Sequence, residues 1–216
     1  MLLISGSEIG RRVAQHRNVI EVAKQAGVQR IVYSSVLCAD TSILSLATEH
    51  RATEADVKSS GIPFTILRNG WYTENNTASI PGAPAGGAFI GSAGEGRISG
   101  ASRADFADAA VAVLTGEGHV RKTYELARDD AYTLTELAAE VSRQTGKTIP
   151  YRNLPEADYA AALAGFGFPK DLAYAIASWD VAASKGALFT ESRQLSGLIG
   201  RPTTPLSVTV KEALKH

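Results

Sequence analysis

The run Asn69-Gly-Trp-Tyr-Thr-Glu74 combines side chains that suit the binding of a flat organic molecule. It offers an amide, a glycine, two adjacent aromatic rings and a carboxylate. The hydrophobic segment 63–67 precedes it and predicts a buried strand. Chemistry in open α/β sheets takes place just past the carboxyl ends of strands, so this run is the expected ligand-binding loop.

Other residue patterns that could do chemistry are weaker. Gly94-Glu-Gly96 followed by Gly100 has one residue too many for a dinucleotide-binding turn, and no strand–turn–helix pattern surrounds it. We interpret it as a surface turn. The four histidines are scattered and the single cysteine has no partner, so no metal site is expected. The sequence also lacks a Gly-x-Ser-x-Gly elbow, which argues against a serine hydrolase of that type.

Strands and helices are expected to alternate along the first part of the chain. Strands are expected over 1–5, 30–36 and 63–67, and helices over 11–26 and 46–60. Strands that are apolar throughout are typical of a parallel sheet covered on both faces. The alternation predicts right-handed crossovers and a parallel sheet, in which strand ends meet at one edge.

Shorter elements are expected in the remainder of the chain. Glycine and proline cluster over 81–100, where we expect a loop with a short hairpin around 88–90. A helix is expected over 102–114 and a strand over 122–127. Thr133-Leu-Thr-Glu136 is a capping box, which predicts that a helix begins there.

These elements predict an α/β fold with a Rossmann-like parallel sheet and a small α/β cap region. We expect the Rossmann-like domain over 1–131 and a substrate-capping region over 132–216, interleaved with 78–100. The chain opens with a strand and its following loop, without the strand and glycine-rich turn that start such a domain. We therefore expect an N-terminally truncated domain that lacks roughly 60–70 residues, or two βα units.

The composition is that of an ordinary globular protein. Of the 216 residues, 44% are hydrophobic and 20% charged, and the formal net charge is zero. Zero net charge argues against nucleic acid or an anionic membrane as partner. The single Cys38 fits a reducing compartment, and the first residues lack a basic region and a membrane-spanning length. The composition thus predicts a cytoplasmic protein.

Five segments together resemble the NmrA-like atypical short-chain dehydrogenases. The resemblance is greatest to the bacterial NAD(P)H:quinone oxidoreductase branch, with the triphenylmethane-dye reductases nearby, and it covers essentially the whole chain. The segments are Gln15-His-Arg-Asn-Val-Ile20, Leu67-Arg-Asn-Gly-Trp-Tyr-Thr-Glu-Asn75, Ser102-Arg-Ala-Asp105, Leu134-Thr-Glu-Leu137 and Leu198-Ile-Gly-Arg-Pro-Thr-Thr204.

The resemblance implies an enzyme that binds NADPH and passes a hydride to a quinone or a similar planar acceptor. Trp71 and Tyr72 would form a flat wall for that acceptor. NADPH is preferred over NADH by the resemblance alone. Local explanations also exist: Glu8 could be a solvated side chain, Trp71 a core anchor and Asp105 a helix cap. The implied cofactor contacts are Ser7, Glu8, Ile9, Asn69, Gly70, Trp71, Tyr72, Thr73, Glu74, Ser102, Arg103, Ala104 and Asp105.

The helix expected over 46–60 carries a candidate catalytic residue. Short-chain dehydrogenases place Tyr-x-x-x-Lys on this helix, one turn apart. Leu46 and His50 occupy those positions here, so the tyrosine acid is absent. His50 could bond the nicotinamide ribose or relay a proton. The alternative is a histidine on the solvent face of the helix.

The sequence departs from the family in the part that anchors the cofactor. The family begins with a Thr-Gly-Ala-Thr-Gly-type turn for the pyrophosphate and an arginine for the 2′-phosphate, and neither occurs here. We therefore expect compromised cofactor binding. The alternative function is a non-catalytic NAD(P)-sensing regulator of the NmrA-like type, which acts through a partner.

The expected partner of the enzyme is a small quinone-like molecule, with neither nucleic acid nor membrane involved. Self-association is a further expectation. The strand over 1–5 would lie beside a strand that this chain does not have, and its unpaired edge is a template for another chain.

Overall fold

The computed structural model describes residues 1–78, 80 and 87–215. Its internal contacts divide the chain into two compact units. Unit 1 comprises Met1–Gly70, Ala104–Asp129 and Ser192–Pro202, and unit 2 comprises Trp71–Arg103, Asp130–Glu191 and Thr203–His216. The division differs from the expected one at residues 71–77, 101–103 and 130–131, which belong to unit 2, and at residues 192–202, which belong to the unit that holds the sheet.

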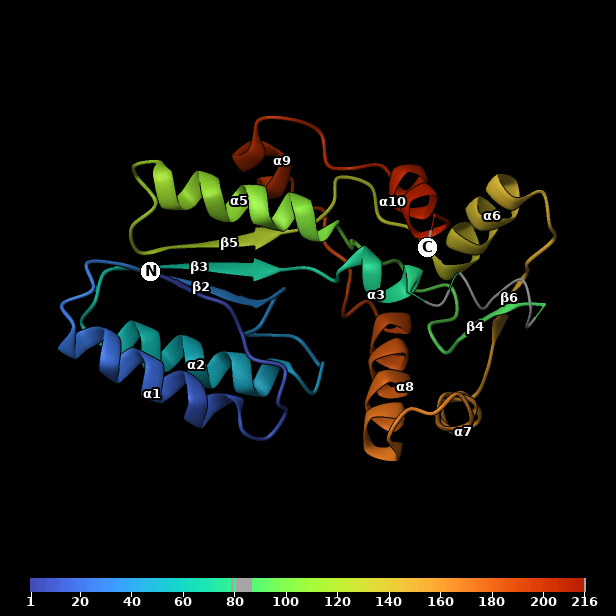
Figure 1. Ribbon diagram of the computed structural model, residues 1–216, viewed down its shortest axis with the longest axis horizontal. Coiled ribbons are helices and arrows are strands. Elements are labelled where there is room, and N and C mark those ends of the chain that lie inside the picture. The colour runs from blue at the N-terminus through green and yellow to red at the C-terminus, as the bar shows by residue number, and fades with distance from the viewer. Residues whose placement is uncertain (79, 81–86, 216) are drawn as a thin grey trace. The chain divides into compact units, whose positions relative to one another are not determined.

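Unit 1 is built on a four-stranded parallel sheet in the order β1-β2-β3-β5. Helices α1 and α2 lie on one face of this sheet and α5 on the other (Figure 1). All of β2 is buried, as expected for a strand covered on both faces. The strands are β1 (Leu2–Leu3), β2 (Ile31–Val36), β3 (Phe64–Asn69) and β5 (Lys122–Leu126), and the helices are α1 (Arg12–Gln25), α2 (Ala47–Ser59), α5 (Arg103–Thr115) and α9 (Gln194–Ile199).

The core between the sheet and helices α1 and α2 is formed by the apolar side chains of these helices and of the strands. Tyr33 of β2 is fully buried there beside Ile66 of β3 and Ile20 of α1. The parallel Rossmann-like α/β fold is therefore confirmed.

Two strand boundaries in unit 1 differ from those expected. The strand expected over 1–5 is paired only at Leu2 and Leu3, because the backbone N–H of Ser5 donates to the Ser34 side chain and leaves the ladder. In contrast, β3 runs on to Asn69, which pairs in register with Val36. Asn69 is therefore the last residue of a strand.

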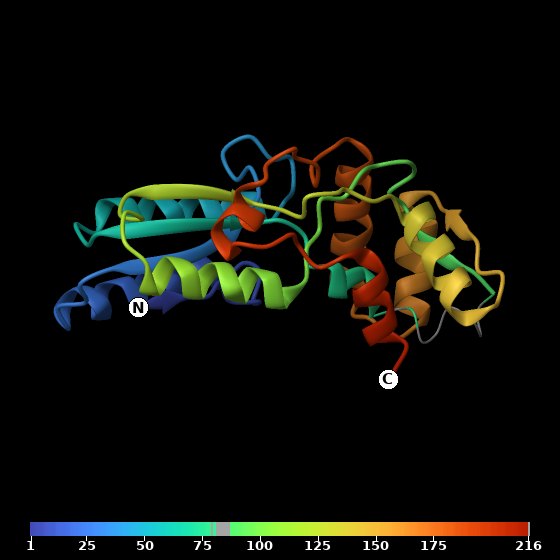
Figure 2. The same ribbon diagram turned by 90° about the horizontal axis from the view of Figure 1, so that it is seen from above.

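The described part of unit 2 contains a two-stranded sheet and five α-helices. In Figure 1 the β4–β6 pair lies between α6 and α7, and Figure 2 shows the same elements from above. The elements are α3 (Thr73–Thr77), β4 (Phe89–Gly91), α6 (Leu134–Thr145), β6 (Tyr151–Asn153), α7 (Glu156–Gly165), α8 (Lys170–Ser184) and α10 (Leu206–Ala213).

The hairpin expected around 88–90 is wrong. Phe89–Gly91 pairs in parallel with Tyr151–Asn153, far along the chain, and parallel strands cannot be joined by a tight turn. Part of the cluster expected as a loop, residues 81–86, lies outside the described residues. The capping box is confirmed, because Thr133 and Glu136 exchange both hydrogen bonds at the start of α6. Gly146 ends that helix with a φ of 68°, in the left-handed region that favours glycine.

Candidate functional site

Unit 2 contains a partly open, largely apolar pocket of about 900 Å³. Its walls come from α3, β4, the start of α6, and from α7 and α8, which pack against each other. A concave, apolar cavity with few polar groups is typical of a small-molecule site. The lining residues are Trp71, Glu74, Asn75, Asn76, Ala78, Ala88, Phe89, Ile90, Arg103, Leu134, Tyr159, Leu163, Phe166, Phe168, Leu172, Ile176, Trp179 and Asp180.

The two tryptophans of the chain face each other in this pocket. Trp71 and Trp179 have ring centroids 5.7 Å apart and an interplanar angle of 66°. Edge-to-face aromatic pairs of this kind hold their rings in fixed orientations. The pocket therefore presents aromatic rings against which a planar conjugated ligand can pack.

Asp180 is the acidic group of α8 in this pocket. Its Oδ2 accepts a hydrogen bond of 2.8 Å from the backbone N–H of Ser92. Burial raises the pKa of Asp180 to about 6, although the bond from Ser92 partly opposes that rise. Gly91 makes this approach possible, because a Cβ on residue 91 would lie 2.7 Å from Oδ2.

Much of the pocket wall comes from residues that were not predicted from the sequence to bind a ligand. Leu172, Ile176 and Trp179 recur at helical spacing along α8 and line the pocket. That periodicity could have marked an apolar face of the helix, but it could not have told a pocket wall from ordinary core packing.

The residues around Tyr72 make polar contacts with Arg103 beside the pocket. The Arg103 guanidinium lies 4.2 Å from the centroid of the Tyr72 ring and donates to Asn75 Oδ1 at 2.9 Å. The backbone N–H of Arg103 donates to Glu74 Oε1 at 2.8 Å. Trp71 lines the pocket, whereas Tyr72 is absent from its lining and carries Arg103 on its ring.

His50 is buried in unit 1, so its placement on the solvent face of α2 is wrong. Its Nε2 accepts from Arg12 Nη1 at 3.1 Å, and its Nδ1 lies 2.8 Å from the Tyr33 hydroxyl. Burial and then the Arg12 charge lower the pKa of His50 to about 3. A neutral ring with both nitrogens engaged favours a structural role over proton relay.

Arg12 and the buried His16 also hold the loop after β1 in place. The Gly6 N–H donates to His16 Nε2 at 2.9 Å, and the Gly6 carbonyl accepts from Arg12 Nε at 2.6 Å. Ser7, Glu8 and Ile9 follow on this loop and are exposed. The fold thus presents these three predicted cofactor contacts on a loop anchored at its base.

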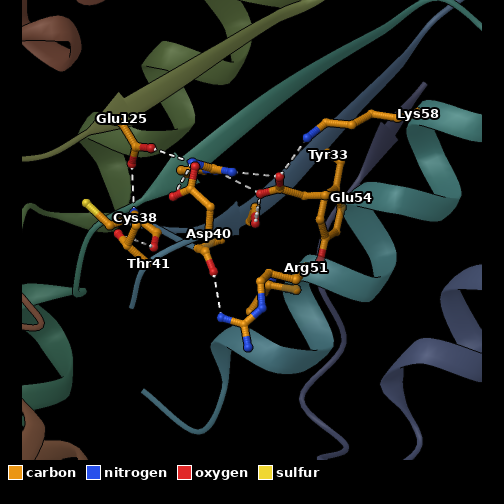
Figure 3. A network of polar contacts seen from close by, with 12 residues as sticks. Tyr33, Cys38, Asp40, Thr41, Arg51, Glu54, Lys58 and Glu125 are labelled. Atoms are coloured by element: carbon orange, nitrogen blue, oxygen red, sulfur yellow. Dashed lines mark hydrogen bonds and ion pairs between the residues drawn. The ribbon is translucent and has the colours of Figure 1, made fainter. Parts of the chain in front are cut away.

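An ion cluster anchors the end of β3, next to Asn69. Arg68 binds Glu54 through two bonds of 2.9 Å and Glu125 at 2.8 Å. Figure 3 shows Glu54 and Glu125 on opposite sides of this network, with Asp40 between them. Burial opposes ionisation of Glu54, but hydrogen bonds from Arg68, Ser35 and Lys58 lower the pKa of its carboxyl.

Asn69 offers a free acceptor at the carboxyl end of this strand. Its Oδ1 is buried and has no hydrogen-bond partner among the described residues. A buried polar atom without a partner is costly, so such an atom at a strand end fits a ligand donor. Asn69 Oδ1 is therefore available to accept a hydrogen bond from a ligand, and its contact with a dinucleotide stays a prediction.

The remaining predicted cofactor contacts lie in different environments. Asp105 is fully buried and pairs with Arg201 at 2.8 Å within unit 1, which occupies its carboxylate. Ser102 and Thr73 are buried, and Ala104 is exposed. Gly70 donates its N–H to the Leu126 carbonyl at 2.7 Å.

Residues 2–117 match the family model described as NAD(P)H-binding. The chain belongs to this family. It is 57% identical to Quinone oxidoreductase 2 of Escherichia coli over 97% of its own length and 73% of that protein's. It is thus a quinone-oxidoreductase-like member of the NAD(P)H-binding family.

Solved structures show the same likeness. The crystal structure of NADPH-dependent quinone oxidoreductase QOR2 from Escherichia coli, complexed with NADPH, matches with a TM-score of 0.96 and 56% identity. That match covers 99% of this chain and 75% of the other. Triphenylmethane reductase of Citrobacter sp., complexed with NADP(H), matches at 0.93 and 36% identity over 98% of this chain and 75% of that chain.

No helix of the described residues is both long enough and apolar enough to cross a membrane. The described residues also contain no group of three or more histidine, cysteine, aspartate or glutamate side chains placed to hold a metal ion.

Proposed function

We propose that this protein transfers a hydride from NADPH to a quinone or a similar planar conjugated acceptor held in the pocket of unit 2. The observation that carries this proposal is the apolar pocket walled by Trp71 and Trp179. Family membership and the relatives named as NADPH-dependent quinone oxidoreductases support the cofactor and the acceptor class.

Bound NADPH would supply the hydride. The chain's own contribution is position and exclusion of water. The tryptophan rings would hold the acceptor flat, and the surrounding apolar side chains would keep water from it. Asn69 Oδ1 would accept a hydrogen bond from the dinucleotide, since it has no partner among the described residues. The chain passes from unit 1 to unit 2 between Gly70 and Trp71, one residue beyond Asn69.

We assign the other cofactor contacts as the family resemblance implies, in the loops at Ser7–Ile9, at 69–74 and at 102–105. The contacts of His50 favour a structural role. It accepts a hydrogen bond from Arg12, which in turn donates to the Gly6 carbonyl in the loop after β1. The pocket favours an enzyme over a non-catalytic sensor, because a sensor has no need of an acceptor site. The expected cytoplasmic location and the expected lack of nucleic-acid and membrane partners remain predictions.

We also infer that these 216 residues bind NADPH more weakly than a relative that carries a glycine-rich phosphate turn. Backbone amides at a helix N-terminus are a major source of pyrophosphate affinity, and the sequence contains no such turn. Calorimetric titration beside Escherichia coli quinone oxidoreductase 2 tests this inference, and equal affinity would contradict it.

The test of the function is NADPH oxidation with 2-methyl-1,4-naphthoquinone as acceptor. We expect Trp179→Ala to raise KM for the naphthoquinone by about ten-fold, the effect of losing one good aromatic contact. Asn69→Ala should instead weaken NADPH binding. Tyr174→Ala is the matched control, because Tyr174 is an exposed aromatic residue of α8 outside the pocket.

Two results would overturn the proposed function. One is the absence of NADPH oxidation by the wild-type protein with any quinone. The other is an unchanged KM for the naphthoquinone in Trp179→Ala, with the fold intact by circular dichroism.

A further inference from the structure

Asp180 is a carboxylate on the wall of an apolar pocket. Its neighbours along α8 that also line the pocket are Ile176 and Trp179. Only Oδ2 is engaged, by the Ser92 N–H, and Oδ1 has no hydrogen-bond partner among the described residues. No ion pair joins Asp180 to any residue of the described chain. An unpaired carboxyl in such a place is costly when ionised, so the site raises the pH at which Asp180 loses its proton.

The groups around Asp180 do not supply a cation. Tyr151 of β6 and Tyr159 of α7 interact electrostatically with it, and burial raises the pKa of both phenols, that of Tyr151 to about 12. Glu74 and Arg103 are the other charged residues of the lining. Arg103 already donates to Asn75 and lies over the Tyr72 ring, so its charge is engaged away from Asp180.

We propose that Asp180 is the proton donor for reduction of an acceptor oxygen in this pocket, and hence a catalytic residue. The proposal rests on the proposed function. Hydride transfer adds two electrons and one hydrogen to the quinone, and NADPH becomes NADP⁺. The resulting hydroquinone anion takes a proton from Oδ1 of Asp180, where the O–H bond breaks. Asp180 is left as a carboxylate and is protonated again from solvent.

The direction of this proton transfer is favourable. The carboxyl of Asp180 has a pKa of about 6, whereas a phenol-like oxygen has an ordinary value of about 10. Tyr159 also lines the pocket, but burial and the charge of Asp180 raise its pKa, so it is the poorer acid. The bond from Ser92 occupies Oδ2 and leaves Oδ1 without a partner among the described residues, so Oδ1 is the oxygen that would carry the proton.

Asp180→Asn is the informative variant, because the amide oxygen can still accept from Ser92 and the amide N–H₂ can still bond an acceptor oxygen. It cannot donate a proton at neutral pH. Two acceptors are compared at saturation: 2-methyl-1,4-naphthoquinone, which needs a proton after the hydride, and a cationic triarylmethane dye. The dye needs no proton, since hydride addition to its central carbon completes the neutral product.

We expect Asp180→Asn to lower kcat with the naphthoquinone by on the order of 10²-fold, with KM little changed. The kcat with the dye should fall far less than that with the naphthoquinone, because the dye needs no proton. In the wild type, kcat with the naphthoquinone should fall as the pH rises through about 6, and this fall should be absent in the variant. Asp171→Asn, an exposed acid in the first turn of the same helix, is the matched control.

The outcomes separate the two proposals. A naphthoquinone kcat that is unchanged in Asp180→Asn overturns the role of Asp180 and leaves the proposed function standing. Equal loss with both acceptors shows that Asp180 only maintains the pocket, which also overturns the role. A wild-type protein that reduces the dye and no quinone overturns the quinone assignment, and with it the proton donor. Selective loss with the naphthoquinone supports both.

Discussion

His50 shows how burial decides what an ionisable side chain does. Arg12 and Tyr33 occupy both of its ring nitrogens, and burial followed by the Arg12 charge lowers its pKa from 6.5 to about 3. The unfolded chain therefore binds a proton at His50 below about pH 6.5, where the folded protein does not. The neutral ring thus contributes stability that is present above pH 6.5 and is lost as the pH falls toward 3.

This linkage predicts a measurable loss of stability in mild acid. Between about pH 7 and pH 5, His50 alone should lower the free energy of unfolding by about 2 kcal/mol. His50→Gln keeps polar atoms at the site and cannot titrate, so its stability should depend less on pH. Urea unfolding of both proteins at the two pH values checks this. If the free energy of unfolding fell equally in the variant and the wild type, His50 would titrate in the folded protein much as in the unfolded chain, which would contradict the prediction.

At the scale of elements, the loop after β4 approaches the last turn of α8 at Gly96. A Cβ on residue 96 would meet the backbone of Ala183, whose carbonyl carbon would lie 2.7 Å away. Backbone cannot move aside as a flexible side chain can, so α8 itself would have to shift. Since α8 carries Trp179 and Asp180, this close approach bears on the pocket wall.

We expect Gly96→Ala to destabilise the protein by about 1–3 kcal/mol, the usual cost of overpacking. Gly165→Ala is the matched control: residue 165 ends α7, has no atom within 4 Å of an added Cβ, and has no positive φ. That change should be neutral or stabilise by about 0.5 kcal/mol. Thermal or urea unfolding distinguishes the two, and equal stability of both variants would rule out the close contact at Gly96.

At the scale of the whole molecule, the sheet of unit 1 has a short edge strand. The order β1-β2-β3-β5 leaves β1 at one edge, where only Leu2 and Leu3 are paired, and the neighbouring Ile4 is 67% exposed. An apolar edge offers unpaired backbone groups to another chain, although a short strand offers few.

We therefore expect concentration-dependent self-association through this edge. Ile4→Lys should reduce it, because a charged side chain directly after the edge strand opposes pairing with another chain. Val111→Lys, at an exposed apolar position of α5, should leave it unchanged. Light scattering over a range of concentrations measures the apparent mass. A wild-type protein that stays monomeric throughout, or an equal effect of both lysines, would refute association through this edge.

The sequence by itself determined the features that depend on neighbouring residues. The alternation of apolar and helical segments led to the parallel α/β sheet, and Thr133-Leu-Thr-Glu136 fixed the start of α6. Both follow from local physics, the periodicity of side chains and the capping of a helix end. The position of the run 69–74 at the end of a strand also predicted that Trp71 contacts a ligand.

Only the tertiary structure decided what depends on residues far apart in sequence. It paired Phe89–Gly91 with Tyr151–Asn153, turned His50 inward, and brought Asp180 beside the Ser92 N–H on the wall that also holds Trp71. Nothing local distinguishes an aspartate on a solvated helix from one in an apolar cavity. The difference lies in desolvation by distant elements, which packing alone determines.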